Sequence, residues 1–319
     1  MQQRYLGRTG LKVSRLGLGI WSWGRDTDEH EARDQLVAFT AAGGTLIDTA
    51  AAYGDGASEE LLGTLLGDVV RRDDVVLATK AGVGMGRSGR RFDASRGYLM
   101  STLDASLRRL QVDHVDLWQV HVWDDRTPLE ETLSALDLAV SSGRVAYAGV
   151  SNYSGWQSAQ AATWQRAVPG RTVVCSNQVE YSLLNRGPEA EVLPAANALG
   201  LGVLAWSPLG RGVLTGKYRS GTPADSRAAS PHFAEFVRAY LDERSARIVE
   251  AVARAADGLD WSPLEVALTW VRDRPGVTAP IVGARTAAQL RGSLTVEELE
   301  LPAQIVSALD DVSAGSTGR

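Results

Sequence analysis

The sequence predicts an α/β fold, a (β/α)8 TIM barrel, from two observations. Short runs that are apolar throughout alternate with amphipathic helical patterns, which is typical of a parallel sheet covered by helices. Eight such runs in one chain of 319 residues favour a closed barrel over an open sheet. The predicted strands are residues 16–20, 45–49, 75–80, 115–121, 145–151, 173–178, 202–207 and 277–283.

Seven helices are predicted between these strands. Ser262 followed by Pro263 is a typical helix start, with an N-cap and a proline in the first turn. The predicted helices are residues 29–42, 58–66, 96–110, 129–141, 156–166, 189–199 and 262–272.

The remaining segments complete a single predicted domain over residues 1–319. Residues 1–14 alternate around a Thr-Gly turn and indicate an N-terminal β-hairpin. Residues 210–240, after the seventh strand, form a long loop rich in Gly, Pro, Arg and Ser, and loops of that length are usually functional or disordered. Residues 314–319 are small and polar, so a flexible tail is expected.

Composition excludes several classes of protein. The net charge of −5 without a long basic run argues against nucleic-acid or anionic-membrane binding. The single cysteine, Cys175, rules out an intrachain disulfide and a cysteine metal cluster, and no metal site is predicted. No apolar run is long enough to span a bilayer and no signal peptide is recognised, so a cytoplasmic location is expected.

Polar side chains stand where three of the apolar strands stop. Asp48, Lys80 and His121 lie at the ends of the second, third and fourth predicted strands, and Tyr53 follows Asp48 by five residues. Because the carboxyl ends of barrel strands form the active face, these side chains are expected to converge. Together they can move a proton to or from a carbonyl or alcohol oxygen. Taken singly, each has an ordinary explanation: a strand-end cap, a loop tyrosine, a solvated charge or a core histidine.

The scarcity of lysine strengthens this interpretation. The chain has only Lys12, Lys80 and Lys217, and arginine supplies the remaining cationic side chains. A lysine at the end of a buried strand is therefore expected to serve for its compact charge and shiftable pKa, which arginine lacks. Beside Tyr53, such an ammonium favours the phenolate and lowers the phenol pKa.

One motif is rejected. The segment from Gly84 to Gly89 matches GxGxxG after a strand, which taken alone suggests a Rossmann dinucleotide site. The last glycine of that motif should open a helix, but four residues intervene before the next helix start near Ser95. A flexible loop over the active face is the better interpretation.

The ordered set of motifs resembles the aldo-keto reductase family, particularly the branch of the potassium channel β subunits and bacterial sugar-type reductases. The resemblance covers nearly the whole chain. It is carried by Leu46-Ile47-Asp48-Thr49-Ala50 with Tyr53-Gly54, Ala78-Thr79-Lys80, Val120-His121, Gly149-Val150-Ser151-Asn152, Asn177-Gln178-Val179-Glu180-Tyr181-Ser182, Trp206-Ser207-Pro208-Leu209-Gly210, Ile281-Val282-Gly283-Ala284-Arg285 and the opening Leu6-Gly7-Arg8-Thr9-Gly10-Leu11-Lys12-Val13-Ser14.

This resemblance implies a nicotinamide-dependent oxidoreductase that reversibly reduces an aldehyde or ketone to an alcohol. It implies a catalytic tetrad of Asp48, Tyr53, Lys80 and His121, with Tyr53 as general acid/base and His121 as a donor to the reacting oxygen. We expect NADPH rather than NADH as the cofactor, because Arg285 could pair with a 2′-phosphate. The implied cofactor-binding residues are Ile20, Trp21, Asp48, Ser151, Asn152, Gln178, Trp206, Ser207, Leu209, Gly212, Lys217, Arg227, Gly283, Arg285 and Gln289.

The substrate side is less defined by the sequence. Trp21, Trp23 and Trp123, with Tyr53 and His121, are candidates for the substrate pocket of a small carbonyl compound or sugar. A sugar or deoxysugar dehydrogenase working in the oxidative direction remains an alternative, as does an NADP-binding regulatory subunit. The channel β subunits lack a histidine where this chain has His121, which favours catalysis. A nonredox barrel enzyme is a fourth possibility, and the oligomeric state is not predicted.

Overall fold

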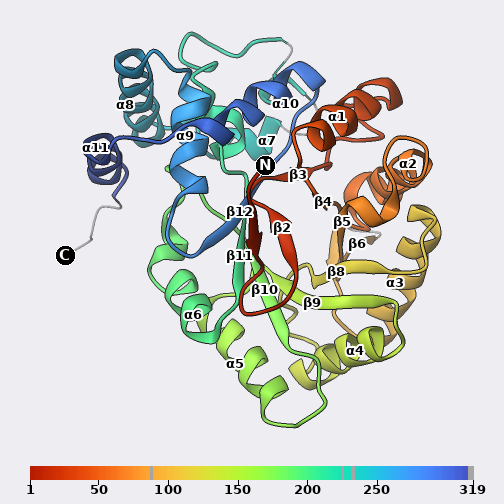
Figure 1. Ribbon diagram of the computed structural model, residues 1–319. Coiled ribbons are helices and arrows are strands. Elements are labelled where there is room, and N and C mark those ends of the chain that lie inside the picture. The colour runs from red at the N-terminus through yellow and green to blue at the C-terminus, as the bar shows by residue number, and fades with distance from the viewer. Residues whose placement is uncertain (87–88, 225, 231–233, 315–319) are drawn as a thin grey trace.

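Eight parallel strands close into a barrel in the computed structural model, which confirms the predicted fold class (Figure 1). Chain order is also the order around the barrel, and the pair β12–β3 links its last and first strands. The structure describes residues 1–86, 89–224, 226–230 and 234–314, so the predicted tail lies outside it apart from Ala314. The barrel strands are β3 (Gly17–Gly19), β4 (Leu46–Asp48), β5 (Val76–Ala81), β8 (Val115–Val120), β9 (Val145–Ser151), β10 (Val174–Glu180), β11 (Gly202–Trp206) and β12 (Val277–Val282).

An N-terminal hairpin closes one end of the barrel. Strands β1 (Gln3–Tyr5) and β2 (Lys12–Ser14) pair antiparallel, as the alternating pattern predicts. Leu6 in the connecting turn is fully buried and belongs to the core cluster inside the barrel. Since the Arg8 N–H donates to the Gly200 carbonyl just before β11, the hairpin covers the amino-terminal ends of the strands. The carboxyl-terminal ends are left for the site.

The seven predicted helices are present with ends shifted by three residues at most, and four further helices, α7, α8, α10 and α11, were not predicted. Figure 1 shows the helices arranged around the strands. The α-helices are α1 (Glu29–Ala41), α2 (Ala57–Leu65), α3 (Arg96–Leu110), α4 (Leu129–Ser141), α5 (Gly155–Arg166), α6 (Val192–Leu199), α7 (Ala234–Arg238), α8 (Glu243–Leu259), α9 (Pro263–Arg272), α10 (Ala287–Leu294) and α11 (Ala303–Ser313). The 3-10 helices are η1 (Tyr53–Gly56), η2 (Arg72–Asp74), η3 (Gly187–Glu189), η4 (Gly210–Thr215), η5 (Arg227–Ala229) and η6 (Thr295–Glu298).

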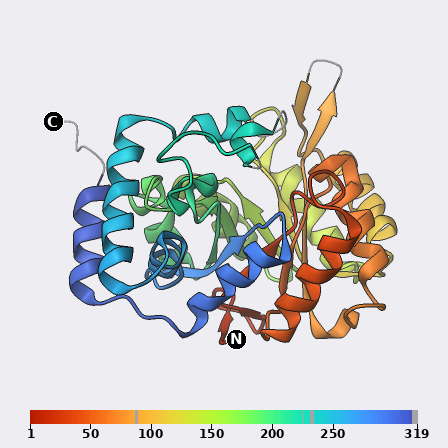
Figure 2. The same cartoon turned by 90° about the horizontal axis from the view of Figure 1, so that it is seen from above.

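Two segments differ from the loops that the sequence predicts. The GxGxxG segment is part of a β-hairpin, β6 (Val83–Gly86) with β7 (Gly89–Phe92), whose residues 87 and 88 lie outside the described ranges. The stretch after β11, which we call the clasp (residues 207–240), contains η4, η5 and α7. Figure 2 shows the hairpin and the clasp on the side of the molecule away from the N-terminus.

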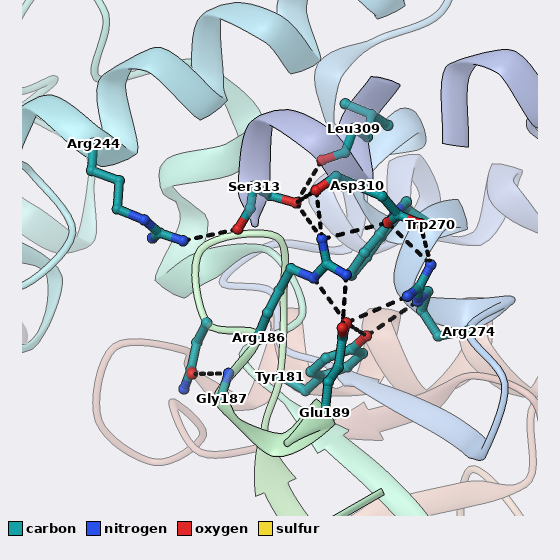
Figure 3. A network of polar contacts seen from close by, with 11 residues as sticks. Tyr181, Arg186, Gly187, Glu189, Arg244, Trp270, Arg274, Leu309, Asp310 and Ser313 are labelled. Atoms are coloured by element: carbon teal, nitrogen blue, oxygen red, sulfur yellow. Dashed lines mark hydrogen bonds and ion pairs between the residues drawn. The ribbon is translucent and has the colours of Figure 1, made fainter. Parts of the chain in front are cut away.

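The C-terminal helix α11 is fixed to the barrel by a group of charged side chains, which we call the C-terminal network: Tyr181, Arg186, Glu189, Arg274 and Asp310 (Figure 3). Arg186 donates two hydrogen bonds to the Glu189 carboxylate, at 2.9 and 2.7 Å, and one to the Asp310 carbonyl at 2.7 Å. Arg274 donates to both carboxylate oxygens of Asp310, at 3.1 and 2.9 Å. These bonds link the β10–α6 connection, α11 and the α9–β12 connection.

Candidate active site

A lysine and an aspartate from neighbouring strands form an ion pair inside the barrel. Lys80 Nζ lies 2.7 Å from Asp48 Oδ2 and also donates to the Thr49 carbonyl at 2.9 Å. The two residues are 1% and 2% exposed. Burial alone would lower the pKa of Lys80, but the Asp48 carboxylate and the Tyr53 phenol outweigh it, so the pKa is raised. Lys80 therefore holds a full positive charge at neutral pH.

The loop after β4 turns the Tyr53 phenol back onto this lysine. Tyr53 begins η1, in which Gly54 and Asp55 have left-handed backbone angles, with φ of 60° and 54°. Glycine and aspartate are among the residues that adopt this region most readily. The turn places the Tyr53 oxygen 3.3 Å from Lys80 Nζ, within the range of a weak hydrogen bond. The phenol thus faces a cation.

His121 lies beside Tyr53. It follows β8, and its backbone N–H donates to the Ala81 carbonyl at the end of β5 at 2.8 Å. Its imidazole ring lies edge to face with the Tyr53 ring, with centroids 5.8 Å apart. The four residues that the sequence assigns to a tetrad therefore lie together at the carboxyl ends of β4, β5 and β8.

Amide and hydroxyl groups at the ends of β9 and β10 form a layer beside the tetrad. Gln178 donates to the second carboxylate oxygen of Asp48 at 2.8 Å, and the Ser151 hydroxyl donates to the Gln178 carbonyl at 2.8 Å. Asn152 donates to the His121 carbonyl at 3.0 Å and accepts a hydrogen bond from the Trp206 indole at 2.9 Å. These bonds fix the orientation of the side-chain amides that face the cavity.

A cavity of about 720 Å³ extends from the tetrad toward α10. The predicted site residues that line it are Trp21, Asp48, Tyr53, His121, Ser151, Asn152, Gln178, Trp206, Ser207, Leu209, Gly212, Lys217, Gly283, Arg285 and Gln289. Lys80 lies behind this wall, where it contacts Asp48 and Tyr53.

Besides Lys80, three predicted residues are not brought to the cavity wall: Ile20, Trp23 and Trp123. The chain turns after β3, where the Trp23 N–H donates to the Ile20 carbonyl, and both side chains are fully buried. The Trp23 indole donates to Gln35 at 3.1 Å, which is a core contact. Trp123 packs edge to face against Tyr153, with centroids 5.1 Å apart. The side chain of Arg227 lies outside the described part of the chain.

The far end of the cavity carries positive charge but few open backbone donors. Arg285 lines it, while the Arg285 N–H donates to the Gln289 side chain at 3.0 Å. At the start of α10, the Ala287 N–H donates to the Glu31 carboxylate at 2.7 Å. Both of these N–H groups thus donate to side chains of the protein, and the Arg285 guanidinium supplies positive charge at this end of the cavity.

Several residues around the cavity were missed by the sequence analysis. Arg211 and Phe236 of the clasp line it, and Thr49 holds Lys80 through its carbonyl. Glu180, at the end of β10, pairs with Arg211. The only signal for Arg211 is its position between Gly210 and Gly212, and Phe236 has none, since it lies in a segment without apolar periodicity.

The donor set fits an extended dinucleotide. Side-chain amides and an indole lie at the tetrad end, whereas Lys217 and Arg285 line other parts of the cavity. Gly212 leaves room beside one of these cations, because a Cβ there would lie 3.3 Å from Lys217 Nζ. Within the described residues, no group of three His, Cys, Asp or Glu side chains could hold a metal ion. In the same residues, no helix has the length and apolarity needed to cross a membrane.

Comparisons with known proteins agree with this geometry. The sequence model of the aldo/keto reductase family matches residues 15–314. The chain is 40% identical to the Bacillus subtilis protein called uncharacterized oxidoreductase YrpG, over 100% of this chain and 98% of that protein. It is 37% identical to a probable voltage-gated potassium channel subunit beta of Oryza sativa subsp. japonica, covering 91% and 89% of the two chains. It is 34% identical to L-glyceraldehyde 3-phosphate reductase of Escherichia coli strain K12, covering 91% and 86%. The chain belongs to the aldo/keto reductase family of oxidoreductases.

Proposed function

We propose that this oxidoreductase uses NADPH to reduce an aldehyde or ketone to an alcohol, reversibly, with Tyr53 as the general acid/base. The observation that carries the proposal is the 3.3 Å contact between Lys80 Nζ and the Tyr53 oxygen, beside the 2.7 Å ion pair of Lys80 with Asp48. An ammonium next to a phenol makes the phenol a stronger acid.

When bound, a nicotinamide cofactor would supply the hydride that the carbonyl carbon of the substrate accepts. Tyr53 donates its phenolic proton to the carbonyl oxygen, where negative charge develops. The Lys80 ammonium stabilises the phenolate that remains, and Asp48 compensates the buried charge of Lys80. His121 donates a hydrogen bond to the same oxygen. In the oxidative direction, Tyr53 takes the proton back from the alcohol.

The cofactor would be held by residues that line the cavity. Asn152 and Gln178 would bind the carboxamide, and the Trp206 indole would lie against the nicotinamide ring. Lys217 and Arg285 would bind phosphate groups, and an arginine beside the adenosine end favours NADPH over NADH.

The similarity to a probable channel β subunit supports a second candidate, an NADP-binding regulatory subunit with weak catalysis. The two functions share the cofactor site and differ in turnover. A regulatory subunit would bind NADPH and reduce aldehydes slowly, and Tyr53→Phe would then change its measured properties little.

Tyr53→Phe tests the general acid. We expect kcat for an aldehyde to fall by about 10²–10⁴-fold, because the proton donor is lost while the aromatic ring stays. NADPH binding, measured by fluorescence titration, should stay within about threefold, since the hydroxyl faces Lys80 rather than the amide layer. The measurement is steady-state turnover in both directions.

Tyr153→Phe is the matched control. Tyr153 is buried, whereas Tyr53 is partly buried, and burial and the nearby Asp124 carboxylate raise the pKa of Tyr153, so it keeps its proton. This variant should turn over like the wild type. Wild-type turnover in Tyr53→Phe itself would show that another group donates the proton.

A further inference from the structure

Three aromatic rings from separate segments lie around the part of the cavity next to Tyr53. Phe236, in α7 of the clasp, lies edge to face with Trp21, with centroids 5.2 Å apart. The same ring is nearly parallel to the Trp206 indole, at 6.3 Å and 19°. Trp21 in turn lies 6.3 Å from the Tyr53 ring. Phe236 therefore joins the aromatic residues at the ends of β3 and β11 into one apolar wall.

Arg211 holds Phe236 in this position. Its guanidinium carbon lies 3.8 Å from the centroid of the Phe236 ring, and Nη1 donates to the Phe236 carbonyl at 2.6 Å. Its other two nitrogens bind both carboxylate oxygens of Glu180, each at 2.8 Å. Both side chains of this ion pair are mostly buried, at 14% and 13% exposed. Bidentate pairs of this kind fix geometry as well as charge.

The backbone at Arg211 is shaped for this role. Arg211 has a left-handed φ of 59°, between Gly210 and Gly212, whose φ values are 54° and 92°. Left-handed angles at a non-glycine residue cost energy and persist only where surrounding contacts hold them. Here the contacts to Glu180 and Phe236 hold the turn, so the barrel strand β10 fixes the position of α7.

The charge around this wall disfavours polar substrates. The positive charge of Arg211 is compensated by Glu180, whereas Glu235, which also lines the cavity, is exposed and lies 3.8 Å from Arg238. A hydroxylated or phosphorylated group against the rings would lose its hydration without gaining partners, which is costly. A flat apolar group would instead bury its surface between aromatic faces.

We infer that Phe236, positioned by Arg211 and Glu180, determines substrate specificity, and that the substrate carries a flat apolar group such as an aryl ring beside its carbonyl. Small polyhydroxylated and phosphorylated aldehydes are poor substrates. This inference rests on the proposed reductase function and names the class of carbonyl compound that the site accepts.

Phe236→Ala tests the wall, with benzaldehyde, D-glyceraldehyde and glyceraldehyde 3-phosphate as substrates. The wild type should prefer benzaldehyde. The variant should lose about 10-fold or more in kcat/KM for benzaldehyde and change by less than about threefold for D-glyceraldehyde, because only the aryl group contacts the ring. Trp164→Ala, a truncation of an exposed aromatic on α5, is the matched control and should change neither value.

A binding measurement tests the aromatic wall independently of turnover. Benzyl alcohol titrated into the NADPH-loaded protein cannot react, and its calorimetric Kd should rise about 10-fold in Phe236→Ala, whereas the Kd of NADPH should stay within about twofold. If no aldehyde is reduced by the wild type, the proposed function fails, but the same titration with and without NADPH still tests the wall.

Arg211→Met provides a second route, because it should release α7 and shift specificity in the same direction while leaving Phe236 intact. Phe236→Leu keeps an apolar side chain but lacks the aromatic ring. It replaces Phe236→Ala in the same measurements if a thermal melt shows that Phe236→Ala does not fold. The inference is overturned if kcat/KM falls equally for benzaldehyde and D-glyceraldehyde. It is also overturned if the wild type prefers glyceraldehyde 3-phosphate, or if weaker NADPH binding explains the fall in kcat/KM.

Discussion

The tetrad and the C-terminal network both combine tyrosine, carboxylate and cation, yet their arrangements differ. In the C-terminal network, the Tyr181 hydroxyl donates to Glu189 at 2.6 Å. Burial and this carboxylate raise the pKa of Tyr181, and they outweigh the opposite effect of Arg274, whose Nε donates to the same hydroxyl at 3.2 Å, so the phenol keeps its proton. In the tetrad, the phenol of Tyr53 faces Lys80 instead. The nearest charge to the phenol, a carboxylate at Tyr181 and an ammonium at Tyr53, is thus the difference expected between a structural tyrosine and the proposed proton donor.

The tetrad and the C-terminal network also differ in how deeply their charged side chains are buried. The Lys80 and Asp48 side chains are 0% and 3% exposed, whereas Arg186 and Glu189 are 16% and 27% exposed. Water can partly replace a lost partner in the C-terminal network, but not inside the barrel. Removing one charge should therefore have a larger effect at the tetrad.

Lys80→Met should produce the largest effect. We expect turnover to fall by about 10²–10⁴-fold, because Tyr53 loses the cation that acidifies it. The free energy of unfolding should fall by about 3–5 kcal/mol, since Asp48 becomes an uncompensated buried charge. Urea denaturation and steady-state kinetics measure the two effects.

The double variant Lys80→Met with Asp48→Asn separates those effects. Neutralising the stranded carboxylate should restore much of the stability but none of the turnover. Recovery of turnover would mean that the ammonium is not needed for catalysis.

Arg186→Met should act on stability alone. It removes the hydrogen bonds to Glu189 and Asp310, so the free energy of unfolding should fall by about 1–3 kcal/mol while turnover stays within about twofold. Arg254→Met removes a mostly exposed pair with Glu250 and should leave the urea midpoint nearly unchanged, because solvent screens such pairs. A large loss of turnover in Arg186→Met would show that the C-terminal network acts on the site.

The smallest expected effect is a pH dependence of stability. Although burial alone would raise it, the hydrogen bonds from Arg186 and Tyr181 hold the pKa of Glu189 below its ordinary value of 4.5. The stabilisation is therefore complete above about pH 4.5 and is lost as pH falls through the lower folded-state pKa. In Glu189→Gln, the urea midpoint of unfolding should depend less on pH between about pH 5 and 3. An unchanged acid slope in this variant would assign the acid sensitivity to other carboxyl groups.

The barrel could be predicted because its strands are buried on both faces and read as apolar runs. Helices α8, α10 and α11 were missed, although Ile248, Val252 and Ala256 of α8 recur at helical spacing and are buried. The β6–β7 hairpin was missed because its glycines carry no alternation that would specify a register. Its backbone pairs antiparallel, with Val83 opposite Phe92 and Gly84 opposite Arg91.

The site residues could likewise be predicted only in part. Residues at strand ends could be brought together by topology, because carboxyl ends of parallel strands meet on one face. Trp23 was placed wrongly because the chain turns after Ile20 and sends its indole into the core toward Gln35. Arg211 and Phe236 meet although they stand 25 positions apart in the sequence, and no local pattern predicts such a contact.

The lone thiol of the protein has a practical consequence. Cys175 is 2% exposed, and burial raises its pKa to about 12. Thiolate, the form that reacts with oxidants and alkylating reagents, is therefore scarce while the barrel is closed. An alkylating dye would mark each molecule once, and only after the barrel opens. The rate of labelling would then report unfolding directly.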